Sequence, residues 1–273
     1  MGWSLSEFYN KKSRVFLKSL FVFSTAISSM GAQALSLDFL SRDKDAIVSN
    51  ADAKTFPVWG MNNFNDSKRV LKEITRAHPV SFYCGCDITF TSNGKKLGFD
   101  FSSCGFQYRK DEQRANRAEA EHIVPISWVG KRMQCWQNGG RKNCQKVSDA
   151  FNRAEADLVN LQYAIGEING DRSDFRYSQW ASDLGRSYGS CDAKVDFKNR
   201  QFEPRKEIRG WIARVHLYMY SKYGVELSRQ QKNLMGEWVK LPPTQWECEY
   251  NAELKRRFGK GAGNPYTDRA CGA

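Results

Sequence analysis

Three histidines are the side chains of this sequence best suited to act as a base near neutral pH, and their surroundings differ. His78 precedes Pro79 at the end of a predicted helix, and His216 lies within a predicted core-facing helix, so we expect structural roles for both. His122 directly follows Glu121 in the stretch EAEHIVP. In such a pair the carboxylate can bind a cation while the imidazole takes a proton from water, although the dipeptide alone is weak evidence.

The apolar run at 123–126 favours a strand that would hold His122 rigidly. Neighbouring residues of a strand point to opposite faces, so Glu121 and His122 can serve one site only where the strand ends or bends. The crowded charges just before the pair favour such a bend.

A second stretch, AIGEINGDRSD at 164–174, also ends a strand-like run in polar residues. Glu167, Asn169, Asp171 and Asp174 offer oxygen ligands of the kind that suit a hard cation such as Mg²⁺. The alternative is a loop or helix start in which Asn and Asp serve as caps. On local grounds this alternative is favoured over a metal site.

The N-terminus has the pattern of a secretory signal peptide. Basic residues at 11, 12 and 14 precede an apolar segment, and small residues follow, with Ala32 and Ala34 at the expected cleavage positions. The alternative is a membrane anchor, but the apolar segment is about 16 residues long and contains Lys18, whereas a span needs roughly 20. We therefore expect export, with cleavage after Ala34.

The charge that remains after this segment is strongly positive. The whole chain carries 42 Lys and Arg against 30 Asp and Glu, and removal of 1–34, with four basic residues and one acidic residue, leaves a net charge of +9. An exported protein with this excess is a candidate for binding a polyanion, although a basic surface can also serve solubility alone.

All eight cysteines follow the predicted signal, which indicates up to four disulfides. Cys135 and Cys144 are close enough to close a small loop, and no other pairing is predicted. Zinc is the alternative use of cysteine. It is disfavoured because no C-x₂-C pair occurs and the histidines are few and scattered.

The remaining pattern predicts one mixed α+β domain at 62–273 with a helix-rich C-terminal half, preceded by the signal at 1–34 and a variable arm at 35–61. The expected N-terminal elements are a helix capped by Asn65 or Asp66 and stopped by Pro79, then a strand at 80–90 that turns at 92–94 into a strand at 95–101. The expected central elements are a disulfide-closed basic loop at 131–147, a helix from Ser148 or Asp149 and a strand at 161–165. The expected C-terminal elements are a helix at 205–224, helices opened by capping boxes at Ser228 and Thr244, and a closing loop at 259–266.

Several stretches together resemble the bacterial endonuclease I family of exported, sugar-nonspecific nucleases. They are FYCGCDITF, SCGFQYRKDEQRANRAEAEHIVP, QCWQNGGRKNC, FNRAEADLVNLQYAIGEINGDRS, IARVHLYMYSKYGVELSRQQ, WECE and GNPY. The resemblance covers roughly 62–268 in the family's order, and the joint pattern is specific although each piece alone is not. One local departure is Ala120, where a bulky residue is expected.

The resemblance implies a ββα-metal (His-Me finger) site. It places the general base at His122, metal ligands at Glu121 and Asn169, and an arginine that contacts the phosphate at Arg141. It further implies Mg²⁺, with Ca²⁺ or Mn²⁺ able to replace it, and substrates of DNA and RNA bound through the sugar-phosphate backbone. We expect a monomer that has no membrane segment once the signal is removed.

Two other classes of function stay open at this stage. A nucleic-acid-binding protein without catalysis would keep the basic surface but would not need Glu121, His122 and Asn169 together. A secreted hydrolase for another substrate would use a carboxylate pair, but no spacing singles one out. Arginines such as Arg109, Arg114, Arg117 and Arg172 fit phosphate contacts and surface ion pairs equally well.

Overall fold

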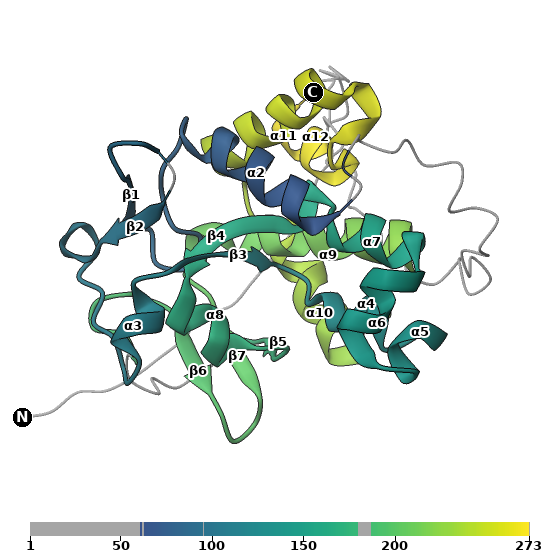
Figure 1. Ribbon diagram of the computed structural model, residues 1–273, viewed down its shortest axis with the longest axis horizontal. Coiled ribbons are helices and arrows are strands. Elements are labelled where there is room, and N and C mark those ends of the chain that lie inside the picture. The colour runs from purple at the N-terminus through teal and green to yellow at the C-terminus, as the bar shows by residue number, and fades with distance from the viewer. Residues whose placement is uncertain (1–60, 62, 95, 180–186, 273) are drawn as a thin grey trace, which may run out of the picture.

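A mixed α+β architecture appears in the computed structural model, which describes residues 61, 63–94, 96–179 and 187–272 (Figure 1). The predicted signal peptide at 1–34 and the predicted arm, except for Met61, lie outside the described residues. Short strands occupy the N-terminal and central parts, and four α-helices fill the C-terminal part. The expected helix-rich C-terminal half is therefore confirmed.

The elements follow one another in chain order. The α-helices are α2 (Phe64–Thr75), α3 (Glu112–Ala115), α4 (Ile126–Gly130), α5 (Gln134–Gln137), α6 (Gly140–Val147), α7 (Asp149–Glu155), α8 (Gly166–Arg172), α9 (Arg209–Tyr223), α10 (Arg229–Trp238), α11 (Gln245–Phe258) and α12 (Pro265–Cys271). The strands are β1 (Asp87–Phe90), β2 (Leu97–Asp100), β3 (Ala118–His122), β4 (Leu161–Ile165), β5 (Arg176–Tyr177), β6 (Lys194–Asp196) and β7 (Gln201–Glu203). Short 3₁₀ turns link several of them.

Three small sheets form, and one of them is continued by a helix. Strands β1 and β2 make an antiparallel hairpin, β5, β7 and β6 make a three-stranded sheet in that order, and β3 pairs antiparallel with β4. In the last pair His122 lies opposite Leu161 and Ala118 opposite Ile165. Helix α8 begins directly after β4 and packs back on both strands, which gives a strand-strand-helix unit.

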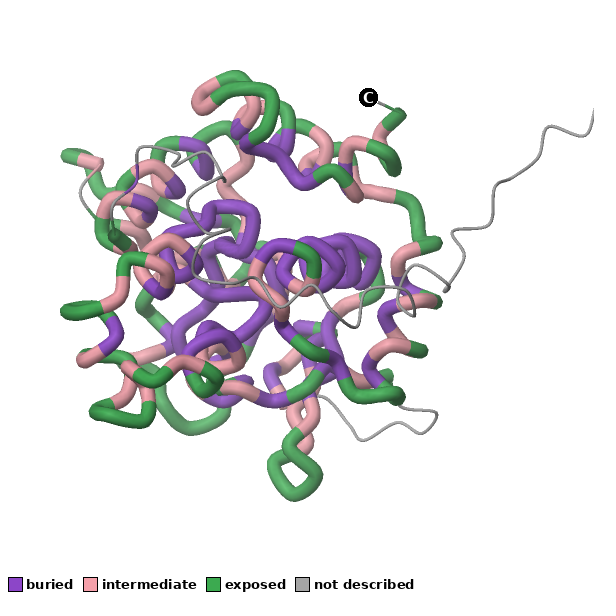
Figure 2. The backbone as a smooth tube through the Cα atoms, turned by 90° about the vertical axis from the view of Figure 1, so that its right-hand side faces the viewer, coloured by how far each residue is buried: buried purple, intermediate pink, exposed green. Residues whose placement is uncertain are grey.

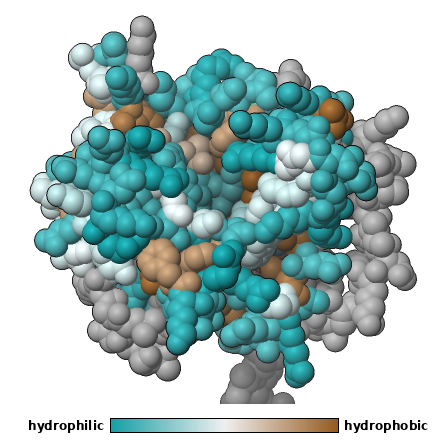
Figure 3. Space-filling view, turned by 60° about the horizontal axis from the view of Figure 1, so that its bottom comes forward, coloured by the Kyte–Doolittle hydropathy of each residue, from teal (hydrophilic) through white to brown (hydrophobic). Residues whose placement is uncertain are grey.

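Helix α9 lies in the middle of the molecule and is buried along nearly its whole length (Figure 2). The core-facing helix predicted from the sequence is therefore covered by neighbours on almost every side. By contrast, the outer face seen in Figure 3 is largely hydrophilic and carries only small, separate apolar patches. No described helix combines the length and the apolar character that a membrane span requires.

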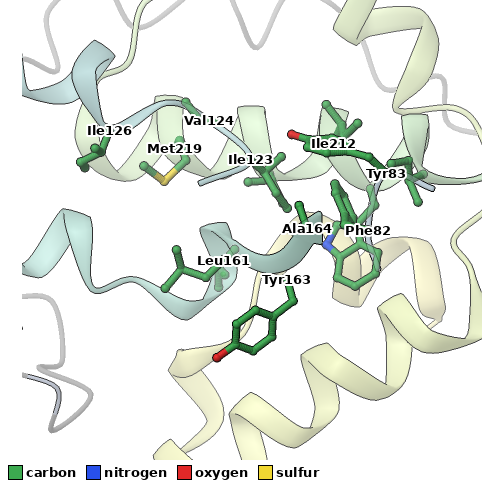
Figure 4. Packing of buried hydrophobic residues seen from close by; sticks show 14 of the residues in the cluster. Phe82, Tyr83, Ile123, Val124, Ile126, Leu161, Tyr163, Ala164, Ile212 and Met219 are labelled. Carbon is green, nitrogen blue, oxygen red and sulfur yellow. The ribbon is translucent and has the colours of Figure 1, made fainter. Parts of the chain in front are cut away.

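The core continues from α9 to the strand pair. Figure 4 shows Ile123 and Val124 between α9, which contributes Ile212 and Met219, and β4 with Leu161. All five side chains are buried. The segment that follows His122 is thus fixed by hydrophobic packing on two sides.

Two N-terminal predictions need correction. Helix α2 is capped by Asn63 and not by Asn65 or Asp66, because the Asn63 side chain accepts both of their backbone N–H groups. The strand expected at 80–90 is regular only at 87–90. Between 81 and 86 the chain turns, with a positive φ at Gly85, and a disulfide leaves from each side of that glycine. The turn at 92–94 and the returning strand are confirmed.

The C-terminal helices follow their sequence signals closely. Ser228 and Thr244 cap α10 and α11 through their side chains, and Gly224 ends α9 in the left-handed conformation. The closing loop was wrong in part, because Asn264 caps a further helix, α12, with Pro265 at its first position. The basic segment at 131–147 is likewise mostly helical, in α5 and α6.

Four disulfides use all eight cysteines: Cys84–Cys191, Cys86–Cys104, Cys135–Cys144 and Cys248–Cys271. The predicted number and the predicted Cys135–Cys144 pair are confirmed. No cysteine is left to bind a metal ion.

The bridges should differ in their contribution to stability. Cys84–Cys191 spans 107 residues and Cys135–Cys144 spans 9. Loop-closure entropy predicts losses of about 4.7 and about 2.6 kcal/mol when each is removed. We expect urea unfolding of the two double Cys→Ser variants to show the larger loss for the long bridge, and equal losses would contradict this entropic account.

Candidate active site

Strand β3 ends at the two residues singled out from the sequence. The expected apolar strand at 123–126 was wrong: the regular strand is at 118–122 and ends with the pair, and the chain then runs through Pro125 into α4. The side chain of Asn160 holds this exit, accepting from the Val124 N–H at 2.7 Å and donating to the Val124 carbonyl at 2.9 Å. Glu121 and His122 thus lie at a strand end, the condition under which neighbours can serve one site.

His122 faces α2 and α7. Its Nε2 lies 2.8 Å from the carbonyl oxygen of Glu155, and its ring stacks on Phe64 with centroids 4.9 Å apart. A carbonyl oxygen can only accept, so Nε2 carries the proton and the lone pair of the neutral ring is on Nδ1. No described residue bonds Nδ1, and the atom is not sealed from solvent.

The imidazole is held in its neutral form. Burial, together with the nearby Arg141 and Arg172 guanidinium groups, lowers the pKa of His122 to about 3, although the bond to the Glu155 carbonyl opposes the shift. Only 6% of the residue is exposed. A neutral ring with a free Nδ1 is in the state that a proton acceptor needs at neutral pH.

Arg141 approaches the same place from α6. Its Nε donates to the buried Glu155 carboxylate at 2.5 Å, and its guanidinium lies over the Phe64 ring at 5.3 Å. The side chain is 42% exposed, and neither of its terminal nitrogens bonds a described residue. Glu155 and Phe64 therefore each contact both His122 and Arg141, which places a cation with two free terminal NH₂ groups close to the imidazole.

Glu121 points to the other face, toward α8. Its Oε1 accepts from Tyr83 Oη at 2.8 Å and from Arg172 Nη1 at 2.7 Å. Burial raises the pKa of Glu121, while Arg172 and Tyr83 favour the charged form. The second oxygen, Oε2, bonds no described residue and is not sealed from solvent.

Asn169 returns to the same face of β3. Its Nδ2 donates to Glu119 Oε2 at 2.8 Å, and Glu119 shares a strand face with Glu121 because the two lie two residues apart. Arg114 holds the other side of Glu119 with two bonds of 3.0 and 3.1 Å. Because the amide nitrogen faces the carboxylate, Oδ1 points away and has no partner among the described residues.

The other oxygen candidates of 164–174 are already used. Both oxygens of Glu167 accept backbone N–H groups of 109–111, at 2.7 to 2.9 Å. Asp171 accepts from Arg109 and Tyr188, and Asp174 is shared by Lys131 and Arg200. Within the described residues no three His, Cys, Asp or Glu side chains gather as a metal cluster. Asn169 is thus the member of this set that keeps an uncommitted oxygen.

The chain is similar to known proteins over most of its described residues. The family model described as Endonuclease I matches residues 64–271. The chain belongs to the endonuclease I family. An extracellular deoxyribonuclease of Aeromonas hydrophila is 47% identical over 215 residues, which cover 77% of this chain and 90% of that protein. A periplasmic deoxyribonuclease of the same species is 45% identical over 212 residues, covering 76% and 86%. Endonuclease-1 of Buchnera aphidicola subsp. Acyrthosiphon pisum (strain APS) is 43% identical over 190 residues, covering 69% and 74%.

As a member of the endonuclease I family, this chain is an enzyme that hydrolyses phosphodiester bonds within nucleic acid. Three of the four arginines considered for phosphate contacts are paired: Arg109 with Asp171, Arg114 with Glu119 and Arg172 with Glu121. These three arginines therefore have mainly structural roles.

The other two histidines have the structural surroundings expected of them. His78 stacks on Trp246 with ring centroids 4.8 Å apart. His216 is buried in α9, and its Nδ1 lies 2.8 Å from the carbonyl of Ile212. Neither lies in the strand-strand-helix unit of this endonuclease.

Sequence reasoning missed the roles of the residues that hold Glu121, His122 and Asn169 in place. They are Glu119, Glu155, Phe64, Tyr83 and Arg172. One signal was present for Glu119, since EAE places two carboxylates on one strand face. A second was Gly170, where an added Cβ would collide with the Arg114 guanidinium. The glycine lets that arginine lie against α8 and reach Glu119.

Replacement of Glu167 by Gln should show whether this residue has a structural role or binds the metal ion. A single amide oxygen cannot replace two carboxylate oxygens that accept three N–H groups, so we expect a loss of about 1–3 kcal/mol in unfolding free energy. Stabilisation by added Mg²⁺, measured by thermal melting, should match that of the unmodified protein. A selective loss of the Mg²⁺ effect would instead identify Glu167 as a ligand.

Proposed function

We propose that this chain is an exported, sequence-nonspecific endonuclease that hydrolyses DNA, and RNA as well, with His122 as general base. The observation that carries the proposal is the Nε2 bond to the Glu155 carbonyl, which leaves a buried, neutral imidazole with its lone pair on an open Nδ1. Family membership supplies the reaction class, and the deoxyribonuclease names of the relatives support DNA as a substrate.

The residues at the strand end also fit a divalent metal ion. Glu121 Oε2 and Asn169 Oδ1 are the oxygens that the surrounding hydrogen bonds leave uncommitted on the α8 side of β3. A carboxylate and an amide oxygen with water in the remaining positions form a donor set typical of Mg²⁺, and Ca²⁺ or Mn²⁺ accept the same donors. When bound there, such an ion would neutralise charge on the phosphate and on the leaving 3′ oxygen.

The protein's own groups would divide the remaining work. His122 Nδ1 takes a proton from a water molecule, whose oxygen then attacks phosphorus, and the Glu155 carbonyl keeps the ring in the required tautomer. Arg141 directs its two free terminal NH₂ groups at the phosphate and balances the charge that develops there. Contacts of this kind reach the backbone and not the bases, which accounts for weak sequence preference.

Export is supported by three separate observations. The first 34 residues have the pattern of a signal peptide, all eight cysteines are oxidised, and relatives carry the words extracellular and periplasmic in their names. We propose that the mature enzyme acts as a monomer outside the cytoplasm. Its substrates are extracellular or periplasmic nucleic acids.

Cleavage assays test the reaction class. Purified mature protein should degrade plasmid and RNA in Mg²⁺, and EDTA should stop both reactions. Binding without cleavage would favour the alternative of a nucleic-acid-binding protein without catalysis. Degradation of the plasmid but not of the RNA would show that the substrate is DNA alone.

Removal of the imidazole tests its role. His122→Ala should lower the cleavage rate by about 10²–10⁴ while Mg²⁺ binding, followed by calorimetry, persists. His78→Ala is the matched control, since that histidine stacks on Trp246 and should leave the rate within a factor of two or so. A comparable loss in both variants would exclude a specific role for His122.

Glu119 should act as a positioning residue for Asn169, because its carboxylate sets which end of the amide turns outward. We expect Glu119→Ala to weaken Mg²⁺ binding about tenfold, as seen for outer partners of metal ligands. Isothermal calorimetry provides the measurement, and exposed Glu112→Ala in α3 is the control. Unchanged affinity in Glu119→Ala would show that Asn169 needs no such support.

A further inference from the structure

The β6–β7 hairpin extends away from the domain, and its turn at 197–200 is exposed (Figure 2). The apolar side chain of Phe197 is 45% exposed at this turn. An exposed phenyl ring at the tip of a projecting hairpin is available for contact with another molecule.

The ring is held in place by contacts that reach the active-site helix. The Arg109 guanidinium lies 4.6 Å from the Phe197 centroid and forms an ion pair of 2.9 Å with Asp171 of α8. The Phe175 ring meets Phe197 edge-on at 6.3 Å, and the Arg200 guanidinium lies 4.8 Å from the Phe175 centroid. The hairpin is therefore fixed relative to α8, the helix that carries Asn169.

Basic side chains lie on the hairpin and beside it. Arg176 and Lys198 are exposed, and neither forms an ion pair with a described residue. Arg200 and Lys131 share the single carboxylate of Asp174. These side chains, except Lys198, border a hollow of about 500 Å³ that reaches from the hairpin to α4 and the start of α10.

We propose that the β6–β7 hairpin and the hollow beside it bind the nucleic-acid strand outside the cleaved linkage, with Arg176 and Lys198 on phosphates and Phe197 against a base or sugar. The inference rests on the proposed function. Exposed cations that form no ion pair with a described residue match a polyanion, and an exposed aromatic ring contacts any base or sugar without regard to sequence. The hydrophilic face with small, separate apolar patches in Figure 3 is unlike a protein-docking surface.

Binding measurements on the full mature chain test this proposal. Fluorescence anisotropy in EDTA, with gel analysis to verify intact probe, gives the affinity for a short duplex and for the single strand of the same sequence. Phe197→Ala should weaken binding to the single strand at least about fivefold, the lower limit for loss of one stacked base. An equal loss on the duplex would assign the ring to the sugar instead of the base.

The double variant Arg176→Ala/Lys198→Ala tests the phosphate contacts. Its slope of log K against log salt on the duplex should be smaller by about 1.8, since each phosphate contact contributes about 0.9. Lys260→Ala/Arg269→Ala removes the same charge at the C-terminal end, far from the hairpin in Figure 1, and Leu241→Ala removes an exposed apolar side chain. Both controls should bind like the unmodified protein.

The outcomes separate this proposal from the one before it. If the unmodified protein cleaves DNA but the hairpin variants match it in affinity and salt slope, the hairpin proposal is overturned and the catalytic one stands. If the hairpin variants lose affinity like the controls, the effect is general charge loss, and the proposal is again overturned. If the unmodified protein binds but does not cleave in Mg²⁺, the catalytic proposal fails, and weaker binding by the hairpin variants still supports a contact there.

Discussion

The buried guanidinium of Arg172 joins strand β3, the chain segment that leaves this strand, and helix α8. It binds the Glu121 carboxylate and the carbonyl oxygens of His122 and Ile123, at 2.5 to 3.0 Å. Those carbonyls lie where β3 ends, so the arginine supplies donors that a further strand would otherwise provide. Because Arg172 closes α8, the same contact fixes the helix against the strand end. Breaking a buried pair of this kind typically costs about 3–5 kcal/mol.

The two faces of β3 have different chemical surroundings. Around Glu121 and Glu119 the carboxylates are matched by Arg172 and Arg114, so charge there is nearly balanced. Around His122, Glu155 offers its backbone carbonyl to the neutral imidazole and its buried carboxylate to the Arg141 cation. Net positive charge over the whole chain therefore says little about the site. What matters is which cations the fold leaves without a carboxylate.

Much of the fold follows from local signals that the sequence displays. The caps Ser228 and Thr244 and the terminator Gly224 act within one helical turn, so their effects can be predicted from neighbouring residues. The turn at 81–86 and the exit at 123–125 could not be predicted in this way. They depend on disulfides to distant cysteines and on the Asn160 side chain.

The residues of the candidate site are likewise only partly predictable from the local sequence. His122 and Asn169 stand out by residue type and position, but the sequence offers Glu167, Asp171 and Asp174 as equal oxygen donors. Only long-range partners, such as the backbone of 109–111 for Glu167, remove these three from consideration. Glu155 has no local feature that marks it, because its role arises from packing of α7 against β3.

Glu155 contributes to the site through two chemically independent groups. Its carbonyl, which sets the tautomer of His122, belongs to the backbone and is present whatever residue occupies the position. Its carboxylate, which anchors Arg141, exists only in an acidic residue. Substitution here changes the arginine and leaves the imidazole tautomer as it was. Substitutions at this position can therefore alter the phosphate contact of Arg141 without affecting His122 as the proton acceptor. The two functions can thus change independently during evolution.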